Sequence, residues 1–299
     1  MNPIGLHTGY WRGTEIESDI FRMLDMTHEA GLDVIEIGIV LFMKMTAGEC
    51  GELARRLREY GMSATLNGGL DETNDLASDD ESVREEGIHY CKSVLEKMPE
   101  LNLTLWSGCN YSRWLRCPSP YDNSDPIEEK KRALALCLES MREIMPTAER
   151  LGIDYCFEVL NRFEQFIFNT SEEAVAFAEK LNSPRAKLLL DVFHMNIEED
   201  SMAQAILHAA KNGKLGHIHA GETNRRVPGI GVTDTNWLGF ADALKKASYQ
   251  GAIIMEPFVL ANAYSAKHIH IWRDLCTNKS LPALMDDARE GGQFLRSLF

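Results

Sequence analysis

The sequence predicts an α/β protein with the fold of a single-domain (β/α)8 TIM barrel over residues 1–299. Eight short β-type runs alternate with amphipathic helical stretches from one end of the chain to the other. No Gly-, Ser- or Pro-rich linker interrupts this alternation, which favours one domain. The length of 299 residues also suits the fold, because such barrels commonly take about 250 residues.

The eight predicted strands are short and mostly apolar. In chain order they are Ile4–Thr8, Val34–Ile39, Ser63–Leu66, Leu103–Trp106, Tyr155–Val159, Lys187–Val192, His217–Ala220 and Ala252–Glu256. The alternative α/β architecture, a doubly wound sheet, would have a glycine-rich phosphate loop after its first strand. The pair Gly229 and Gly231 lies far from that strand, so the barrel is favoured.

The predicted helices have apolar residues at three- and four-residue spacing, as expected for helices that cover a sheet. They are Glu15–Ala30, Cys50–Glu59, Glu81–Lys97, Ile127–Leu151, Ser171–Leu181, Met202–Lys211 and Trp237–Ser248. Thr170 and the acids that follow it are typical of a helix N-terminus. After the last strand we expect an irregular segment, Ala261–Ser280, and a closing helix, Leu281–Leu298.

Charge and composition exclude several classes of protein. The formal net charge is −14, which disfavours nucleic acid as a partner because its phosphates would be repelled. No apolar run approaches the roughly 20 residues of a membrane span, and the N-terminus lacks the pattern of a secretory signal. We therefore expect a cytoplasmic protein with no membrane partner. The seven cysteines form no C-x-x-C pair, which argues against structural zinc and against a disulfide framework.

Four charged residues stand at or near the ends of four successive strands: Glu158, Asp191, His219 and Glu256. In a parallel barrel the C-terminal strand ends share one rim, so we expect these side chains to converge. Carboxylates beside such apolar runs are costly to bury unless a cation compensates them. Three oxygen ligands and one nitrogen ligand suit Mn²⁺, Co²⁺ or Mg²⁺, and they are also compatible with zinc.

Further polar residues lie close to these four in the sequence. His217 shares a face with His219, but one layer deeper, and is expected to be a core histidine. His194 follows Asp191 and would overhang the site, either as a second nitrogen ligand or, as we favour, as a hydrogen-bond donor to substrate. Glu164 and Arg225 fall in the loops after the fifth and seventh strands, which border the active site in barrels.

The strings around these residues resemble a known family. EVLNRFE (158–164), LLDVFHMNIEED (189–200), GHIHAGETNRRVPG (216–229), IIMEPF (253–258) and WRDL (272–275) are similar to the D-tagatose 3-epimerase family, which includes the D-allulose (D-psicose) 3-epimerases. The similarity covers nearly the whole chain and is densest in its second half.

The resemblance implies one divalent metal per subunit, Mn²⁺ or Co²⁺, bound by the four residues at the strand ends. It implies substrate contacts by Glu164, His194 and Arg225, an aromatic wall at Trp114 and a pocket acid at Glu36. It also implies a homodimer or homotetramer. His7 stands where relatives commonly carry Tyr or Phe, at a wall for the far end of the sugar, so the identity of the sugar is left open.

The chemistry of such a site fits the same residues. Inverting a carbon next to a ketone requires a proton to leave one face and another to arrive at the opposite face. Glu158 and Glu256 can supply these two acid/base groups, and a metal on O2 and O3 would stabilise the enediolate. We therefore expect a ketose 3-epimerase acting on a free ketohexose, either the D-fructose/D-allulose or the D-tagatose/D-sorbose pair.

Three other functions are compatible with parts of the pattern. An aldose–ketose isomerase on the same barrel would move a proton between C1 and C2 with similar metal chemistry. A metal-dependent phosphoesterase or abasic-site endonuclease would need more clustered histidines and a basic groove. A catalytically silent sugar-binding protein would lack one of the acids, and all of them are present.

Overall fold

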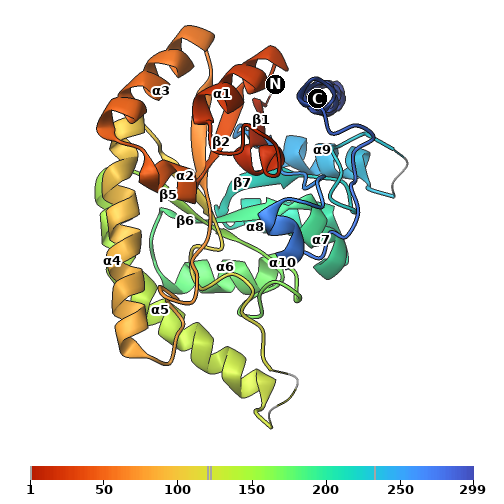
Figure 1. Ribbon diagram of the computed structural model, residues 1–299. Helices are drawn as coiled ribbons and strands as arrows, with labels where there is room; N and C mark the ends of the chain where they lie inside the picture. Colours follow the sequence, from red (N-terminus) through yellow and green to blue (C-terminus); the bar gives the residue numbers. More distant parts are fainter. Residues whose placement is uncertain (1, 120, 122, 232–233) are drawn as a thin grey trace.

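Eight parallel strands close into a barrel in the computed structural model, which describes residues 2–119, 121, 123–231 and 234–299 (Figure 1). Each strand pairs with the next in chain order, and β1 also pairs with β8. The strands are β1 (Ile4–His7), β2 (Val34–Gly38), β3 (Ser63–Asn67), β4 (Leu105–Gly108), β5 (Asp154–Glu158), β6 (Ala186–Asp191), β7 (Leu215–Ala220) and β8 (Ile253–Met255). The predicted fold class is confirmed.

Helices follow the strands and surround the barrel (Figure 1). The longer ones are α1 (Ile20–Glu29), α3 (Ala47–Tyr60), α4 (Glu81–Lys97), α5 (Pro126–Leu151), α6 (Ser171–Lys180), α8 (Met202–Lys211), α9 (Trp237–Lys246) and α11 (Leu281–Ser297). Short helical segments add η1 (Thr8–Trp11), α2 (Ile39–Lys44), η2 (Met98–Leu101), α7 (Val192–Glu198) and α10 (Tyr264–His268). The C-terminal helix α11 packs against β1 and α1, so the two chain ends lie side by side (Figure 1).

Several predicted boundaries differ from the structure by a few residues, and the segment Ala261–Ser280, expected to be irregular, contains the short helix α10. Local capping and turn geometry explain two of the differences. The first helix begins at Ile20, later than predicted, since the Asp19 side chain accepts a hydrogen bond from Arg22 N and caps it there. The fourth strand begins at Leu105 because Asn102 adopts a left-handed conformation (φ 55°) that ends η2. The predicted cap at Thr170 is confirmed, since its side chain accepts from Glu173 N.

The barrel interior beneath the rim contains both polar and apolar side chains, among them Glu36, His217 and Ile254. Gly5 of β1 lies against Val34 of β2 and Ile254 of β8, which close this part of the interior. The larger apolar side chains, including Trp106, Tyr155 and Phe157, are fully buried.

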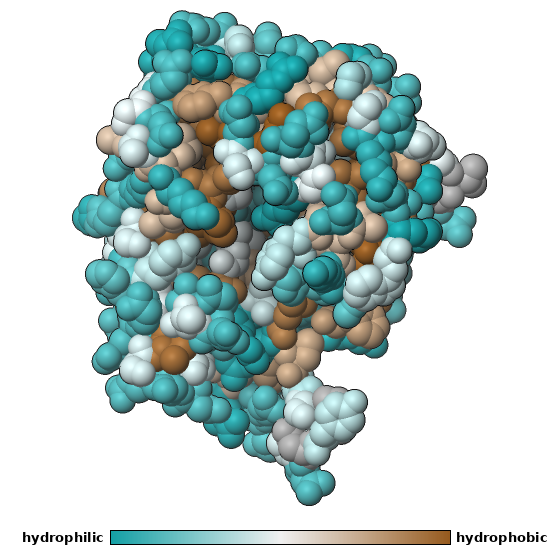
Figure 2. Space-filling view, viewed as in Figure 1, coloured by the Kyte–Doolittle hydropathy of each residue, from teal (hydrophilic) through white to brown (hydrophobic). Residues whose placement is uncertain are grey.

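The outer surface is mostly hydrophilic on the face shown in Figure 2, which is hollowed near its centre. This agrees with a sequence in which a quarter of the residues are charged. Within the described part of the chain, no helix combines the length and the apolar character needed to cross a membrane.

Replacement of Gly5 by Ala is expected to destabilise the barrel. An added Cβ would lie 2.4 Å from Ile254 Cδ1 and 2.7 Å from the Val34 carbonyl oxygen, so the interior would have to shift. Overpacking of this kind costs about 1–3 kcal/mol in the free energy of unfolding, measurable by urea denaturation. Gly51→Ala on α3 is the control: a Cβ there meets no atom within 4 Å, and we expect unchanged or slightly higher stability. Equal effects of the two changes would contradict this description of the interior.

Candidate metal centre and active site

The four residues predicted as metal ligands converge at the C-terminal rim of the barrel. Glu158 ends β5, Asp191 ends β6, His219 lies in β7 and Glu256 directly follows β8. One potential ligand atom from each lies within 4.8 Å of every other, and all four side chains are buried. Two ligands on opposite sides of one ion lie about 4.3 Å apart, so small side-chain movements would bring these four into coordination range.

Buried atoms without hydrogen-bond partners show that this donor set fits a cation. Asp191 uses Oδ1 to accept a hydrogen bond from Phe193 N and so caps α7, while its Oδ2 accepts no hydrogen bond from the described residues. His219 Nδ1 is likewise buried without a hydrogen bond in that part of the chain. A buried acceptor without a donor is unfavourable, and a divalent ion between these atoms would satisfy both.

The two glutamates of the cluster have opposite pKa shifts. Burial raises the pKa of Glu158, and a hydrogen bond from His194 only partly opposes this. Burial would also raise the pKa of Glu256, but the imidazoles of His219 and His7 and the guanidinium of Arg225 outweigh it and lower that pKa to about 2. Two carboxylates at one site are therefore held in different environments, which is common where acid and base must work together.

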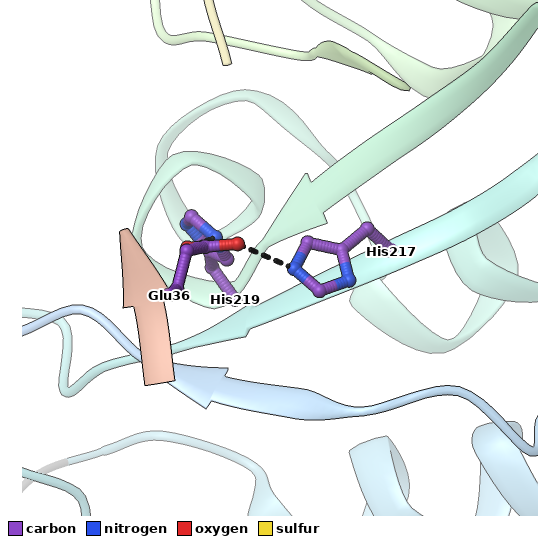
Figure 3. A group of neighbouring side chains, drawn as sticks. All are labelled: Glu36, His217 and His219. Atoms are coloured by element: carbon purple, nitrogen blue, oxygen red, sulfur yellow. Dashed lines mark hydrogen bonds and ion pairs between the residues drawn. The ribbon is translucent and has the colours of Figure 1, made fainter. Parts of the chain in front are cut away.

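His219 stands between two layers of carboxylates. Its Nδ1 faces the metal cluster, 3.4 Å from Glu256 Oε2, while its Nε2 lies 2.7 Å from Glu36 Oε2 in the layer below (Figure 3). Burial lowers the pKa of His219, but Glu36 and Glu256 outweigh it and raise the pKa well above its usual value. The position therefore attracts positive charge, whether from a proton or from a metal ion.

Glu36 and His217 form the layer beneath the rim. Glu36 comes from β2 and is 0% exposed, and its Oε1 pairs with His217 Nε2 at 2.8 Å (Figure 3). This is the hydrogen-bonded core position expected for His217. Both oxygens of Glu36 thus face histidine nitrogens, and its contact with a sugar stays a prediction.

His194 is oriented by the loop after β5. Asn161 N donates a hydrogen bond to His194 Nδ1 at 3.1 Å, so Nδ1 must keep its lone pair and the proton of the neutral ring sits on Nε2. That Nε2 lies 3.5 Å from Glu158 Oε1 and 3.8 Å from Asp191 Oδ2. His194 therefore presents a donor toward the cluster rather than a vacant ligand atom.

Arg225 and Glu164 form a buried ion pair at the edge of the cluster. Arg225 Nη2 donates to Glu164 Oε1 at 3.1 Å, while Nη1 lies 3.5 Å from Asp191 Oδ2 and 3.6 Å from Glu256 Oε2. Trp114 Nε1 donates to Glu164 Oε2 at 2.9 Å, which joins the loop after β4 to the site. Arg225 itself has a positive φ of 68°, a backbone conformation that is uncommon for residues other than glycine.

His7 joins the site from β1. Its Nδ1 accepts a hydrogen bond from Gly9 N at 3.1 Å and lies 3.6 Å from Glu256 Oε1. Its buried Nε2 has no hydrogen-bond partner among the described residues. Burial lowers the pKa of His7 despite the nearby Glu256, so the neutral ring with a proton on Nε2 is favoured.

Three site residues were not singled out by the sequence reasoning. Asn161 contacts both His194 and Glu164, with its Nδ2 3.0 Å from Glu164 Oε1. Phe193 and Phe258 pack on the Arg225 guanidinium, at 3.8 and 5.1 Å from its carbon to the ring centres. Each lies within or next to a recognisable motif, but no spacing rule indicates that an amide orients a histidine or that two rings hold an arginine.

A closed (β/α)8 barrel with convergent acids, imidazoles and an arginine at its C-terminal rim defines the class of TIM-barrel enzymes. Comparison with known proteins narrows this class. The family model of the xylose isomerase-like TIM barrel matches residues 24–278.

Similar proteins cover almost the full chain. The D-psicose 3-epimerase of Enterocloster bolteae is 35% identical over 99% of this chain and 95% of its own length, and that of Agrobacterium fabrum is 34% identical over 98% and 97%. The crystal structure of D-psicose 3-epimerase with D-tagatose from Clostridium cellulolyticum H10 matches with a TM-score of 0.90, at 32% identity and 99% coverage of both chains. The chain therefore belongs to the xylose isomerase-like TIM barrel family and, within it, to the ketose 3-epimerases, which are carbohydrate isomerases.

Asp191→Asn is expected to weaken Mn²⁺ binding strongly. Asn can still cap α7, but it replaces one carboxylate oxygen by an amide and removes the negative charge that faces the other ligands. The loss should exceed the roughly 10–100-fold seen when only a residue behind a ligand is changed. Isothermal titration with Mn²⁺ measures it. Asp200→Asn, at an exposed acid on the same segment, is the matched control and should bind as the wild type does. Unchanged affinity in Asp191→Asn would mean that the metal does not bind here.

Proposed function

We propose that this protein is a metal-dependent ketose 3-epimerase in which Glu158 and Glu256 exchange the C3 proton of a free ketohexose. The observation that carries the proposal is that these two carboxylates, from β5 and β8, share one buried cluster with Asp191 and His219. One cluster thus combines a cation-binding donor set with two groups able to move protons. The names of the full-length relatives support the same reaction class.

The residues that would hold the metal are Glu158, Asp191, His219 and Glu256, which offer three oxygens and one nitrogen. This donor set favours Mn²⁺ or Co²⁺, with Mg²⁺ also suitable. When bound, such an ion stabilises negative charge that develops on two adjacent oxygens of a sugar.

The two glutamates would carry the proton transfers. In one direction the carboxylate of one glutamate takes the proton from C3, and the electron pair of the broken C–H bond moves toward the C2 carbonyl oxygen. The other glutamate, in its acid form, then donates a proton to the opposite face of C3. After one forward turnover the first glutamate is the acid and the second is the carboxylate, which is the state that the reverse reaction needs. A second forward turnover requires the proton to return from the first glutamate to the second, directly or through water.

The surrounding donors would fix the sugar. His194 presents Nε2–H toward the cluster, and Arg225 presents Nη1, so both can donate to the sugar oxygens at C1 and C2. Glu164 would bind the hydroxymethyl end next to the Trp114 ring. His7, whose Nε2 is buried without a partner in the described chain, would contact the far end of the sugar.

The substrate we propose is one of the pairs D-fructose/D-allulose or D-tagatose/D-sorbose. Relatives named as D-psicose 3-epimerases and as L-ribulose 3-epimerases support a ketose, and the solved structure with D-tagatose supports this size of sugar. We also propose a cytoplasmic homodimer or homotetramer, as the family resemblance implies.

The Mn²⁺-loaded protein should convert D-fructose to D-allulose, or D-tagatose to D-sorbose, without forming an aldose. Sugar chromatography of the equilibrated mixture measures this, with protein stripped of metal as the control. An aldose as main product would instead identify an aldose–ketose isomerase, in which the proton moves between C1 and C2.

Glu158→Gln and Glu256→Gln should each abolish turnover even at saturating Mn²⁺. Removal of a general base alone typically costs roughly 10²–10⁴-fold in rate, and here an acid/base group and a metal ligand are lost together. Initial rates and bound Mn²⁺ are measured on the same samples. Near wild-type turnover in either variant with metal bound would refute the two-glutamate scheme.

A further inference from the structure

Glu36 lies inside the barrel, beneath the rim, and each of its oxygens lies close to a histidine nitrogen. Oε1 pairs with His217 Nε2 at 2.8 Å and accepts from Thr65 Oγ1 at 3.0 Å, while Oε2 lies 2.7 Å from His219 Nε2 (Figure 3). The residue is 0% exposed. Since β2 and β7 are not neighbours in the barrel, this contact crosses the interior.

Glu36, His217 and His219 also have the composition of a second metal site, since one ligand atom of each lies within 4.8 Å of the others. The distances argue against an ion there. Ligands bound to one ion at about 2.1 Å are separated by about 3 Å or more, whereas each of these N–O pairs is at hydrogen-bond distance. A hydrogen bond joins Glu36 Oε1 to His217 Nε2 without an ion. Glu36 Oε2 and His219 Nε2 are close enough to share a proton but are not aligned as a hydrogen bond, and neither has another hydrogen-bond partner among the described residues.

The position of the ring proton determines which nitrogen of His219 can bind a metal. A neutral imidazole carries one proton, and a metal binds the nitrogen that lacks it. With the proton on Nε2, shared with Glu36, the lone pair of Nδ1 is free and points toward Asp191, Glu158 and Glu256. With the proton on Nδ1, that nitrogen could not bind the metal, and the site would lose its fourth ligand.

We propose that Glu36 is a positioning residue that keeps the proton of His219 on Nε2 and so presents Nδ1 to the metal. The proposal rests on the proposed metal site and gives Glu36 a role beneath the site instead of a contact with the sugar. His217 supports it from the other side, because its Nε2–H occupies Oε1 and leaves Oε2 for His219. Carboxylates behind metal-binding histidines also increase the basicity of the ligand.

Glu36→Gln tests the proposal. Its amide keeps one acceptor oxygen and replaces the other by an NH2 donor, so one of the two histidines loses its acceptor and the negative charge behind His219 disappears. We expect Mn²⁺ to bind about 10–100-fold more weakly, as for other residues behind metal ligands, by isothermal titration or electron paramagnetic resonance. Glu36→Asp, which keeps the charge, should recover part of the affinity.

Asp75→Asn is the matched control. Asp75 is also a buried acid, but it binds Arg116 at 2.7 Å in the loops after β3 and β4, away from the metal ligands. The Asp75→Asn substitution should lower the stability of the protein without changing its affinity for Mn²⁺. Wild-type affinity in Glu36→Gln would overturn the role of Glu36 and leave the metal site intact. Absence of Mn²⁺ binding by the wild-type protein would instead overturn the proposed function.

Nitrogen NMR of the histidine rings tests the same proposal without a variant. In the wild-type protein loaded with Mg²⁺, His219 should show a protonated Nε2 and an unprotonated Nδ1. A protonated Nδ1 would overturn the assignment. Two Mn²⁺ ions bound per subunit in titrations would also overturn it, because the second ion would lie at Glu36.

Discussion

The electrostatic cost of burying acids determines the organisation of this active site. Glu158, Asp191 and Glu256 are brought together at the barrel rim, each with little access to solvent. Burial of like charges is strongly unfavourable unless cations or hydrogen bonds compensate it. Arg225 supplies one positive charge beside them, and a divalent ion in the centre would supply the rest. The same negative surroundings that require a cation also make the site able to hold one.

The barrel compensates these buried charges in two layers of side chains, which have different roles. The rim carries the ligands and the groups that would touch a sugar, while Glu36 and His217 in the layer below compensate each other and contact His219. Loops supply the orienting groups: Asn161 fixes the ring of His194, and two phenylalanine rings hold Arg225. Strand ends thus set the positions of the proposed metal ligands, and loop residues set the positions of the hydrogen-bond donors.

The sequence predicted the strands and the convergence of the four proposed ligands because both depend on local patterns. A charged residue that ends an apolar run identifies a strand end, and the closed barrel then brings such ends together, as for Asp191 after Leu188–Leu190. The partners of Glu36 could not be predicted in this way, because the contact between β2 and β7 depends on how the barrel interior is filled. Asn161 was missed for a related reason, since its role depends on a backbone N–H that no side-chain pattern reveals.

The central claim is that this site moves the proton of C3, and the position of solvent hydrogen in the product tests it most directly. The Mn²⁺-loaded protein is incubated in D₂O with D-fructose and with D-tagatose, and the sugars are followed by NMR. We expect deuterium at C3 together with the C3 epimer. Deuterium at C1 with formation of an aldose, or epimer formation without deuterium at C3, would contradict it.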